Sequence, residues 1–352
     1  MEEPIKNKIN INEGIRIQEV HFCLLCDSEG ILCYQGLRDR LFGAPGIWSF
    51  MRCPECGLVW LNPQPIFKDI VKLYKTYFTH STDNHISKFA RLRKLIRKSI
   101  LATYLGYTEL ADSTSQKILG RILSLAGPIK EMVELGVMSL NGQKRGRLLD
   151  IGCGSAAFLA KMRELGWDGV GVDFDRKAIK VVRENFGLNI YEGTIEEANF
   201  SENEFDALTM NHVIEHLYDP ITTLKECYRV LKSGGKLVIT TPNIESLGAR
   251  LFDGAWRGWE APRHLHVFSP RTLRSCVERV GLRICKLRTT SRSAPFMWTE
   301  SRFIRRNSTV LKGFPKKQCL WIRLGRLAFH VLEFGLTMFK NAGEEIVLVA
   351  TK

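Results

Sequence analysis

Short apolar runs alternate with amphipathic stretches between residues 143 and 290 of the chain. The runs are rich in β-forming residues and the stretches have helical spacing, which is the pattern of βαβ units. The runs predict strands at 147–152, 169–173, 188–192, 205–211 and 236–241, and the stretches predict helices at 155–166, 175–186, 219–232 and 270–281. This alternation predicts a doubly wound α/β fold with a parallel sheet.

Single residues mark where some of these elements begin and end. Asp219 and Pro220 suit the start of a helix, because Asp caps free N–H groups and Pro fits the first turn. We expect Gly234 and Gly235 to end that helix and to turn the chain into the next strand. The apolar residues of 345–352 predict one further strand.

The rest of the sequence divides by composition. Residues 1–65 hold five cysteines and predict a small separate module, followed by a helical linker or cap over 66–142. Residues 143–352 predict the α/β domain, with an insertion over 291–343. From Leu320 to Phe339 apolar residues recur at helical spacing, with basic residues on the other side. A helix of this kind covers a sheet or a substrate pocket, or it lies on an anionic membrane.

The chain of 352 residues is basic, with 51 Lys and Arg against 37 Asp and Glu, which gives a net charge of +14. This charge favours anionic partners such as nucleic acid, nucleotide-linked sugars or a membrane surface. The first residues are polar, and no uncharged apolar stretch reaches the ~18 residues of a membrane span. We therefore expect a cytoplasmic protein, with a peripheral position at the inner membrane face compatible with its basic helix. Its ten cysteines are then expected to be reduced, and to bind metal or be buried.

A glycine-rich turn follows the first predicted strand of the sheet, in the sequence Asp150-Ile-Gly-Cys-Gly154. Gly152 and Gly154 allow the backbone to approach a ligand closely at the carboxyl edge of the sheet, where such folds bind ligands. Asp173 ends the next strand, 19 residues after Gly154, which is the usual place for a carboxylate that binds ribose hydroxyls. The ordered set of strand, turn, helix, strand and acid predicts a cofactor that contains a nucleoside.

Two classes of cofactor use this arrangement. Dinucleotide enzymes place a pyrophosphate at the start of the helix, and an aspartate is a poor neighbour for that group. Asp150 stands just before the glycines, where a negative charge suits a ligand with a positive amine and no pyrophosphate. S-adenosylmethionine is such a ligand, and an NAD-dependent oxidoreductase is the alternative that Asp150 disfavours.

At these residues the sequence resembles the class I S-adenosylmethionine-dependent methyltransferases, from about residue 145 to 290 and again at the final strand. The resemblance implies a seven-stranded Rossmann-like sheet whose last strand runs antiparallel. It also implies cofactor contacts at the glycine turn, at the ends of three strands and in the segment that flanks the adenine. The residues it assigns to the cofactor are Asp150, Gly152, Gly154, Asp173, Thr194, Ile195 and Asn211.

The segment His212-Val-Ile-Glu-His216 follows the strand predicted at 205–211. It also matches the inverted zinc-protease signature, which requires both histidines on one helix face. Because His212 directly follows a strand, we prefer a loop that faces the methyl donor. Histidine can accept a proton from a hydroxyl acceptor at neutral pH. The hypothesis is that His212 or His216 is the base and that Glu215 orients it, and the alternative is that the segment only holds the loop together.

A second pair of histidines lies downstream in Pro262-Arg-His-Leu-His-Val-Phe-Ser-Pro270. This stretch resembles the acceptor-side loop of methyltransferases of ubiquinone-type biosynthesis and of sugar-cluster enzymes. His264 and His266 alternate, so in a strand they would share one face. We name His264 as a catalytic candidate, with a structural role for both histidines as the alternative.

The N-terminal cysteines form two pairs, Cys23-Leu-Leu-Cys26 and Cys53-Pro-Glu-Cys56. Four thiolates in two such knuckles make a closed tetrahedral site, which predicts structural Zn²⁺. The run from Cys53 to Pro65 resembles the zinc-ribbon front end of bacterial methyltransferases of sugar and secondary metabolism. By that resemblance, tyrosines shortly after the ribbon approach the active site. Tyr74 and Tyr77 stand in a comparable place, and Tyr77 is the one we name as a candidate.

These signals favour a methyltransferase that acts on a small-molecule or glycan-type acceptor, which could be nucleotide-linked. O-methylation is slightly favoured because a histidine base is available. An RNA-binding or RNA-methylating zinc-ribbon protein is the main alternative, supported by the charge but by no aromatic-rich recognition motif. A scaffold that binds the cofactor without catalysis is a further alternative.

Overall fold

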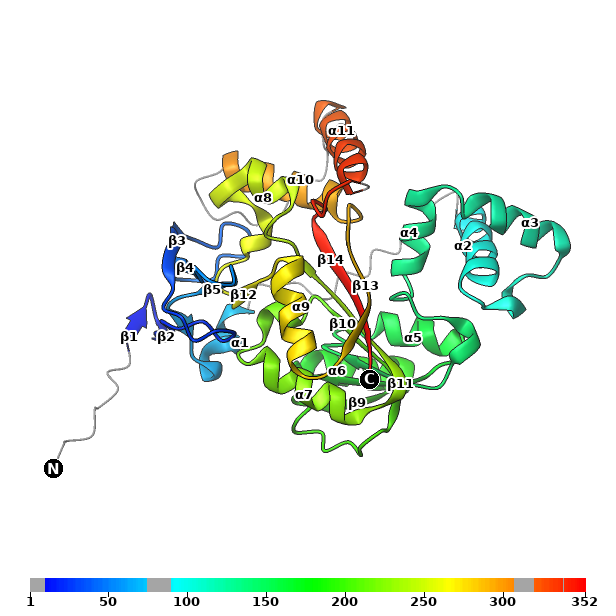
Figure 1. The fold of residues 1–352 in the computed structure, drawn as a ribbon, viewed down its shortest axis with the longest axis horizontal. Helices are drawn as coiled ribbons and strands as arrows, with labels where there is room; N and C mark the ends of the chain where they lie inside the picture. Colours follow the sequence, from blue (N-terminus) through cyan, green and yellow to red (C-terminus); the bar gives the residue numbers. More distant parts are fainter. Residues whose placement is uncertain (1–9, 75–89, 307–319, 338) are drawn as a thin grey trace.

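The computed structural model describes residues 10–74, 90–306, 320–337 and 339–352. Its centre is a seven-stranded sheet (Figure 1). In spatial order the strands are β9 (Asn189–Glu192), β8 (Asp168–Asp173), β7 (Arg147–Ile151), β10 (Phe205–Asn211), β11 (Leu231–Pro242), β14 (Glu345–Thr351) and β13 (Arg283–Thr290). Strands β7 to β11 pair in parallel, whereas β14 is antiparallel to both β11 and β13. The predicted doubly wound sheet with an antiparallel last strand is confirmed.

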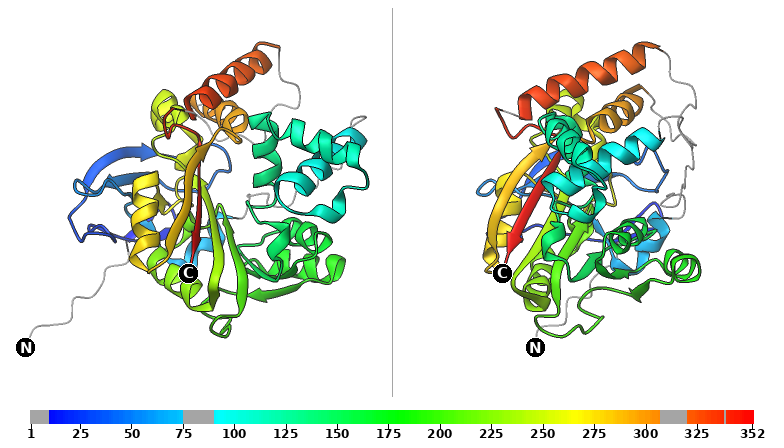
Figure 2. Two further views of the ribbon diagram at one scale, coloured as in Figure 1. Left: turned by 45° about the vertical axis from the view of Figure 1, so that its right-hand side comes forward. Right: turned by 90° about the vertical axis from the view of Figure 1, so that its right-hand side faces the viewer.

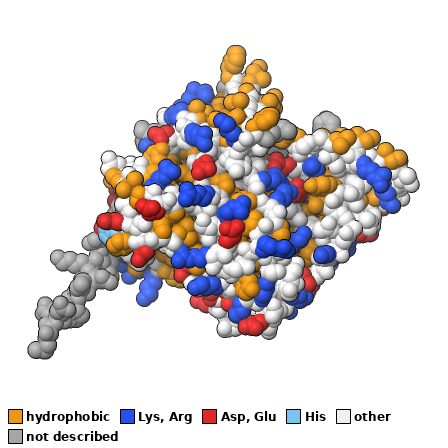
Figure 3. Space-filling view, in the orientation of Figure 1, with side chains coloured by type: hydrophobic (Ala, Val, Ile, Leu, Met, Phe, Trp, Pro, Cys, Tyr) orange, Lys and Arg blue, Asp and Glu red, His pale blue; other side chains and the backbone are white. Residues whose placement is uncertain are grey.

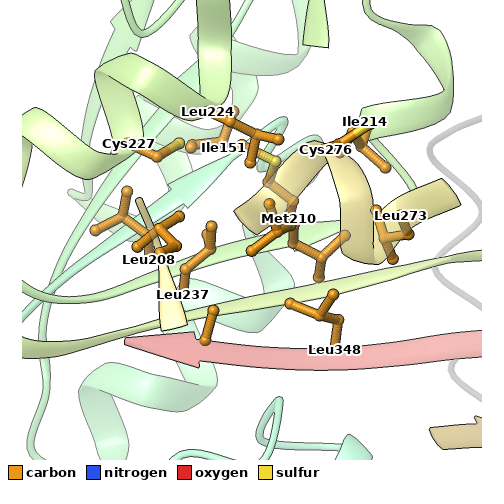
Figure 4. Close-up of a cluster of buried hydrophobic side chains, with 14 of the residues drawn as sticks. Ile151, Leu208, Met210, Ile214, Leu224, Cys227, Leu237, Leu273, Cys276 and Leu348 are labelled. Carbon is orange, nitrogen blue, oxygen red and sulfur yellow. The ribbon is translucent and has the colours of Figure 1, made fainter. Parts of the chain in front are cut away.

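Helices cover both faces of this sheet. One face carries α7 (Pro220–Val230) and α9 (Pro270–Arg279), and the other carries α5 (Ala157–Glu164) and α6 (Arg176–Phe186). Successive strand residues alternate between the two faces, as the pleat of a sheet requires. Figure 4 shows the first of these cores, where the side chains of Cys227 from α7 and Cys276 from α9 lie among leucines and isoleucines. Because the strands and helices bury side chains in these two cores, they carry the apolar runs that can be recognised in the sequence.

The end of α7 differs from the prediction. The helix ends at Val230, and Leu231 already pairs with Phe205 in the sheet, so Gly234 and Gly235 do not end the helix. The glycines lie instead in a bulge of β11, because the register jumps from Phe205–Leu231 to Ala207–Lys236. Gly234 has a φ of +75°, a conformation that favours glycine, and this requirement explains the residue.

The N-terminal region forms two small sheets, seen at the left of Figure 1. One contains β1 (Asn10–Asn12), β2 (Ile15–Gln18) and β6 (Gln64–Pro65). The other contains β3 (Ile31–Leu37), β4 (Trp48–Arg52), β5 (Val59–Leu61) and β12 (His266–Val267). Because β12 comes from the segment between β11 and α9, the N-terminal region shares a sheet with the loop of the α/β part that carries His264 and His266.

The remaining helices lie at the rim of the α/β part. Helix α1 (Ile70–Leu73) follows the small sheets, and α2 (Ala90–Tyr104), α3 (Thr114–Leu123) and α4 (Gly127–Leu135) form a group at the right of Figure 1. Helices α8 (Leu247–Phe252), α10 (Ala294–Arg306) and α11 (Leu320–Thr337) lie above the carboxyl edge of the parallel strands (Figures 1 and 2). Within the described residues, no helix is long and apolar enough to cross a bilayer.

Candidate active site

The glycine turn connects β7 to α5 at the carboxyl edge of the sheet. Gly152 has a φ of +69°, and a Cβ there would lie 2.5 Å from the Val213 side chain. Gly154 has a φ of +50°, and among the described residues no neighbouring atom lies within 4 Å of the place where its Cβ would be. The turn therefore packs against the segment that follows β10 on one side and borders open space on the other. Open space beside a glycine backbone is what close approach of a cofactor requires.

Asp173 ends β8 beside this turn. Its carboxylate accepts hydrogen bonds from the backbone N–H of Gly154, at 2.7 Å, and of Asp175, at 2.8 Å. Burial raises the pKa of Asp173, and these backbone donors oppose the rise. The carboxylate is thus fixed in orientation at the turn and keeps lone pairs that can accept from hydroxyl groups.

Asp150 lies beneath the turn and is buried. Its Oδ1 accepts a hydrogen bond of 2.6 Å from the Thr209 hydroxyl. Burial raises the pKa of Asp150 to about 7, with Thr209 opposing the rise and Asp173 adding to it. A carboxylate in this state gains from a cationic group placed beside it.

The other expected cofactor residues lie at the same edge of the sheet. Thr194 and Ile195 follow β9, where the Thr194 hydroxyl accepts from the backbone N–H of Glu197 at 3.3 Å. The Ile195 side chain is fully buried in the core, so only its backbone can face a ligand. Asn211 is exposed at the end of β10, and its Oδ1 accepts from the Thr240 hydroxyl at 2.6 Å.

His212 is held between two carboxylates. Its φ is +56°, its Nδ1 lies 3.1 Å from Oε1 of Glu215, and its Nε2 lies 2.9 Å from Oε1 of Glu345. Burial alone would lower the pKa of His212, but these two carboxylates outweigh it and raise the pKa to about 10. His212 is therefore a cation at neutral pH, with both ring N–H groups engaged.

Glu215 is the buried partner in this arrangement. Its second oxygen accepts from the Thr241 hydroxyl at 2.9 Å. Burial would raise the pKa of Glu215, yet His212 lowers it to about 2. Residues 214–216 form a single turn of 3-10 helix, so the two histidines of the inverted zinc-protease signature do not share an α-helix face. The protease alternative is wrong.

His216 and His264 form a second pair of rings. The rings meet edge to face with their centroids 4.8 Å apart. Nδ1 of His216 lies 2.9 Å from the Arg263 carbonyl, and Nδ1 of His264 lies 2.7 Å from the Gly258 carbonyl. Because a carbonyl only accepts, each Nδ1 carries a proton, and in a neutral ring of this kind Nε2 is the nitrogen that can accept.

The two histidines differ in their surroundings. His264 is buried, and burial lowers its pKa to about 4, while Nε2 lies 3.5 Å from Glu260. His216 is only partly buried and is the more accessible of the pair. His266 also is buried, with its Nδ1 3.1 Å from the Leu217 carbonyl. The expectation that His264 and His266 share a strand is wrong, because the strand starts at His266 and Glu260 to His264 form a turn.

Two further residues connect these groups: Tyr74, which the resemblance placed beside the candidate Tyr77, and Glu345, which sequence reasoning missed. The Tyr74 hydroxyl lies 3.4 Å from Nδ1 of His216, and the Tyr74 ring meets the ring of Phe174, the residue after Asp173, edge to face. Tyr74 thus spans from the end of β8 to His216. Tyr77, the expected tyrosine, lies outside the described residues. No motif marks Glu345, although its place at the start of an antiparallel strand puts it at the carboxyl edge.

Arg263 connects the histidines to the N-terminal region. Its guanidinium is buried and lies 2.8 Å from Oδ2 of Asp39, a residue that follows β3, and 3.1 Å from Oε1 of Glu260. Its Nη1 donates to the Leu73 carbonyl at 3.1 Å. Because the Arg263 carbonyl accepts from His216, this buried ion-pair network fixes the backbone that orients the ring.

The structure brings the four N-terminal cysteines together. The Sγ atoms of Cys23, Cys26, Cys53 and Cys56 lie within 4.8 Å of one another. Both knuckles close in the same way, with the N–H of Asp27 bonding the Cys23 carbonyl and the N–H of Gly57 bonding the Cys53 carbonyl. Asp27 and Gly57 have φ angles of +57° and +82°. Aspartate tolerates this conformation better than most residues, so it serves here in place of glycine.

Comparison with known proteins agrees with this geometry. The family model described as a methyltransferase domain matches residues 129–287. The ubiquinone biosynthesis O-methyltransferase of Cereibacter sphaeroides is 33% identical over 147 residues, which cover 39% of this chain and 60% of that protein. The protein of the same name from Roseobacter denitrificans is 42% identical over 102 residues, which cover 28% and 41%. The chain thus spans 60% or less of the length of these two relatives.

Two solved structures illustrate what the chain is similar to. A SAM-dependent methyltransferase from Archaeoglobus fulgidus is 24% identical with a TM-score of 0.41, covering 59% of this chain and 86% of that one. Phosphoethanolamine N-methyltransferase 2 from Haemonchus contortus, in complex with S-adenosyl-L-methionine, is 17% identical with a TM-score of 0.44, covering 88% and 64%. The strand order, the glycine turn and the matched family model together show an S-adenosylmethionine-dependent methyltransferase domain over residues 129–287.

Proposed function

We propose that this protein transfers the methyl group of S-adenosylmethionine to a hydroxyl oxygen of a small-molecule acceptor, with His216 as the base. The observation that carries the proposal is the placement of His216, joined through Tyr74 and Phe174 to Asp173 at the cofactor turn. The matched relatives are named O-methyltransferases, which supports an oxygen acceptor.

The residues at the turn fit this cofactor. Asp173 offers oriented lone pairs for ribose hydroxyls, and Gly154 leaves space for a ligand beside the backbone. Asp150 offers a buried carboxylate for the positive amine. When bound, the cofactor supplies an activated methyl group on a sulfonium, and the protein has to align the acceptor and remove its proton.

His216 suits the proton transfer better than His212 does. A base must be neutral at working pH, and two carboxylates keep His212 protonated. His216 has its proton fixed on Nδ1 by the Arg263 carbonyl, so the lone pair of Nε2 can accept the acceptor proton. In this proposal the ion pairs of His212 with Glu215 and Glu345 fix the conformation of the loop. The ring of His264 packs against the ring of His216 and supports it.

We further propose that the four cysteines hold a structural zinc ion. Four thiolates from two knuckles fill a tetrahedral zinc shell and leave no open position for substrate, so the ion stabilises the fold without taking part in the reaction. The convergence of all four Sγ atoms supports this assignment.

The test begins with the cofactor and then removes the base. Purified protein is titrated calorimetrically with S-adenosylmethionine, S-adenosylhomocysteine and NAD, and acceptors with phenolic or sugar hydroxyls are screened by release of S-adenosylhomocysteine. With the acceptor found, His216→Gln is expected to lower kcat by about 10²–10⁴-fold and to leave cofactor affinity unchanged. His21→Gln, at an exposed histidine in the N-terminal region, is the matched control.

Two results would contradict the proposal. Binding of NAD without binding of the two sulfur ligands would remove the cofactor assignment. Unchanged kcat in His216→Gln would show that another residue is the base. Methyl transfer to nitrogen or carbon acceptors only would contradict the assignment of an oxygen acceptor.

A further inference from the structure

Helix α11 exposes an unusual number of large apolar side chains. Phe329 and Glu333 are its buried residues, whereas six large apolar side chains are between 47% and 80% exposed. The six are Leu320, Trp321, Leu324, Leu327, Val331 and Leu332. Scattered exposed leucines are common on soluble proteins, but a contiguous group on one helix marks a surface with a partner.

The six side chains form one stripe. At about 100° per residue they fall within a single arc of the helix, and Phe329 and Glu333 lie on the opposite side, against the protein. Figure 3 shows hydrophobic side chains gathered on the projecting end of the molecule that Figure 1 identifies as α11. We call these six side chains the α11 stripe.

The stripe continues onto the neighbouring helix group. The Cβ position of Gly127, at the start of α4, lies 3.1 Å from the Phe334 ring of α11. Leu125, two residues before Gly127, is 86% exposed. An apolar residue of the α3–α4 connection therefore lies near the C-terminal half of α11, which widens the apolar surface.

Positive charge borders the stripe along one flank. Arg323, Arg326 and His330 fall in the arc between the exposed and the buried sides of α11. Helix α10, which packs against α11, is also basic near its end, where it carries Arg302, Arg305 and Arg306. In the sequence, residues 301–332 contain eight Lys and Arg and no Asp or Glu.

We propose that the α11 stripe docks this protein on an anionic lipid bilayer. The apolar side chains would enter the boundary between headgroups and acyl chains, and the flanking arginines would contact lipid phosphates. A second copy of the chain would cover the same apolar surface, but it would bring two strongly basic segments together. An anionic bilayer complements both the stripe and its charge, so it is the partner that the surface fits. The proposal does not depend on the acceptor or on the base.

Trp321 provides a direct probe. All seven tryptophans lie in the described part of the chain, and Trp321, at 80% exposed, is the one that is exposed. The full chain is mixed with vesicles of phosphatidylglycerol and phosphatidylcholine, or of phosphatidylcholine alone, and binding is followed by co-sedimentation. We expect binding to the anionic vesicles, a blue shift of the tryptophan emission and protection of Trp321 from iodide.

Variants separate the apolar from the electrostatic part. Leu324→Ser with Val331→Ser keeps the probe and is expected to weaken partitioning at least about tenfold, because two branched side chains no longer enter the bilayer. Arg323→Glu with Arg326→Glu is expected to abolish the preference for anionic vesicles. Ile31→Ser, at a 57% exposed side chain on β3, is the control and should bind like the unmodified protein.

The outcomes are distinguishable. Thermal midpoints and S-adenosylmethionine titrations establish that each variant is folded. Absence of vesicle binding, or binding that both double variants leave intact, would overturn the proposal. A dimer in sedimentation velocity that Leu324→Ser with Val331→Ser abolishes, without vesicle binding, would assign the stripe to a second copy instead.

Discussion

Two aspartates near the glycine turn differ in their hydrogen-bond partners. Asp150 is buried with one hydroxyl donor, and its pKa is raised to about 7, whereas Asp173 accepts from two backbone N–H groups. The first is therefore poised to lose a proton when a cationic ligand arrives. The second is placed to hold neutral hydroxyls.

The state of Asp150 predicts a pH dependence of cofactor binding. Below a pKa of about 7 the carboxyl is mostly protonated and cannot attract a positive amine, so affinity should rise with pH and level off above 7. Calorimetric titrations from pH 5.5 to 8.5 measure this change, with up to about tenfold per pH unit on the acid side. Asp150→Asn should bind more weakly and show no such slope, and a slope that persists in this variant would assign it to another group.

Asp173 predicts a loss of cofactor affinity when its side chain is removed. Asp173→Ala removes an acceptor for ribose hydroxyls and should weaken S-adenosylmethionine binding by about 1.5–3 kcal/mol, the contribution of a hydrogen bond to a charged group. Asp168→Ala, at the exposed start of the same strand, is the control for strand stability. Equal affinity in Asp173→Ala and the unmodified protein would exclude the ribose role.

Sequence reasoning can place single residues where the pattern is local. Asp150, Gly154 and Asp173 stand at fixed distances from strand ends, so their spacing was sufficient to bring them to one turn, and their contacts with a cofactor stay predictions. Tyr74 and Glu345 gain their roles from contacts with His216 and His212, which lie 142 and 133 positions away. No local pattern encodes such contacts, because they depend on how separate elements pack.

At the scale of elements, the pairing of β5 with β12 joins the cysteine cluster to the histidine loop. Trp60 pairs with His266, and the second cysteine knuckle precedes β5 in the chain. Asp39 and Arg263 add a buried ion pair between the same two regions. The small sheet is therefore a support for the loop that carries His264 and orients His216.

Loss of the cysteine site should therefore affect more than the N-terminal region. Cys53→Ser, or removal of metal by a strong chelator, should lower the thermal midpoint and release one zinc per chain, because zinc-bound knuckles fold with their ion. Metal analysis and scanning calorimetry measure both effects, and Cys285→Ser, at an exposed cysteine on β13, is the control. A purified protein free of zinc that keeps its midpoint would contradict the structural metal.

Helix α11 carries a buried glutamate that opposes stability at high pH. Within the described residues, neither oxygen of Glu333 has a hydrogen-bond partner, and burial together with Glu344 raises its pKa to about 10. The folded state thus holds this proton more tightly than the unfolded state. Stability is expected to fall as pH rises above the ordinary glutamate value towards the raised one.

Glu333→Gln tests this expectation. The variant removes the titrating group and should raise the free energy of unfolding by about 1–3 kcal/mol at pH 8, with little change at pH 4.5. Denaturant unfolding at both pH values measures the difference, and Glu278→Gln, at an exposed residue of α9, is the control. A variant that is destabilised equally at both pH values would show that Glu333 contributes as a packed side chain only.

Helices and strands could be predicted where the apolar residues repeated with a single helical or strand period. The strand at 205–211 matches β10 at both ends, and the helix at 175–186 differs from α6 by one residue. The start of β11 was missed because the bulge at Gly234 and Gly235 reads as a helix end in sequence. Strands of the N-terminal region were not predicted, since β5 and β12 are short and come from distant segments.

The whole molecule combines the seven-stranded sheet of the methyltransferase fold with two small N-terminal sheets and additional helices. The sheet and its cofactor turn follow from the sequence pattern, whereas the helices around the acceptor side, α2 to α4 and α10 to α11, carry no motif. Among these helices, α11 carries the exposed apolar stripe, and the chain as a whole has a net charge of +14. The division of the chain expected at residues 65 and 142 stays a prediction. One small sheet pairs strands from before residue 65 with β12, which lies after residue 142.

Cofactor binding should stabilise the molecule as a whole. A ligand that binds only the folded state raises the free energy of unfolding by about 2.7 kcal/mol at a concentration of 100 times its Kd. Thermal scans with S-adenosylhomocysteine should show this rise, whereas NAD should show none. An equal rise with both ligands would indicate a site that reads only the adenosine that they share.

The position of β14 has a consequence for how the chain is made. This strand lies between β11 and β13 and supplies Glu345 to His212, so the central sheet stays open along β11 until residues 345–351 have been synthesised. An unpaired strand edge in the middle of a core readily pairs with the wrong partner. From residue 242 until residue 351 has been made, the nascent chain therefore carries an unpaired strand edge, and closure of the sheet and pairing of His212 with Glu345 become the same late event.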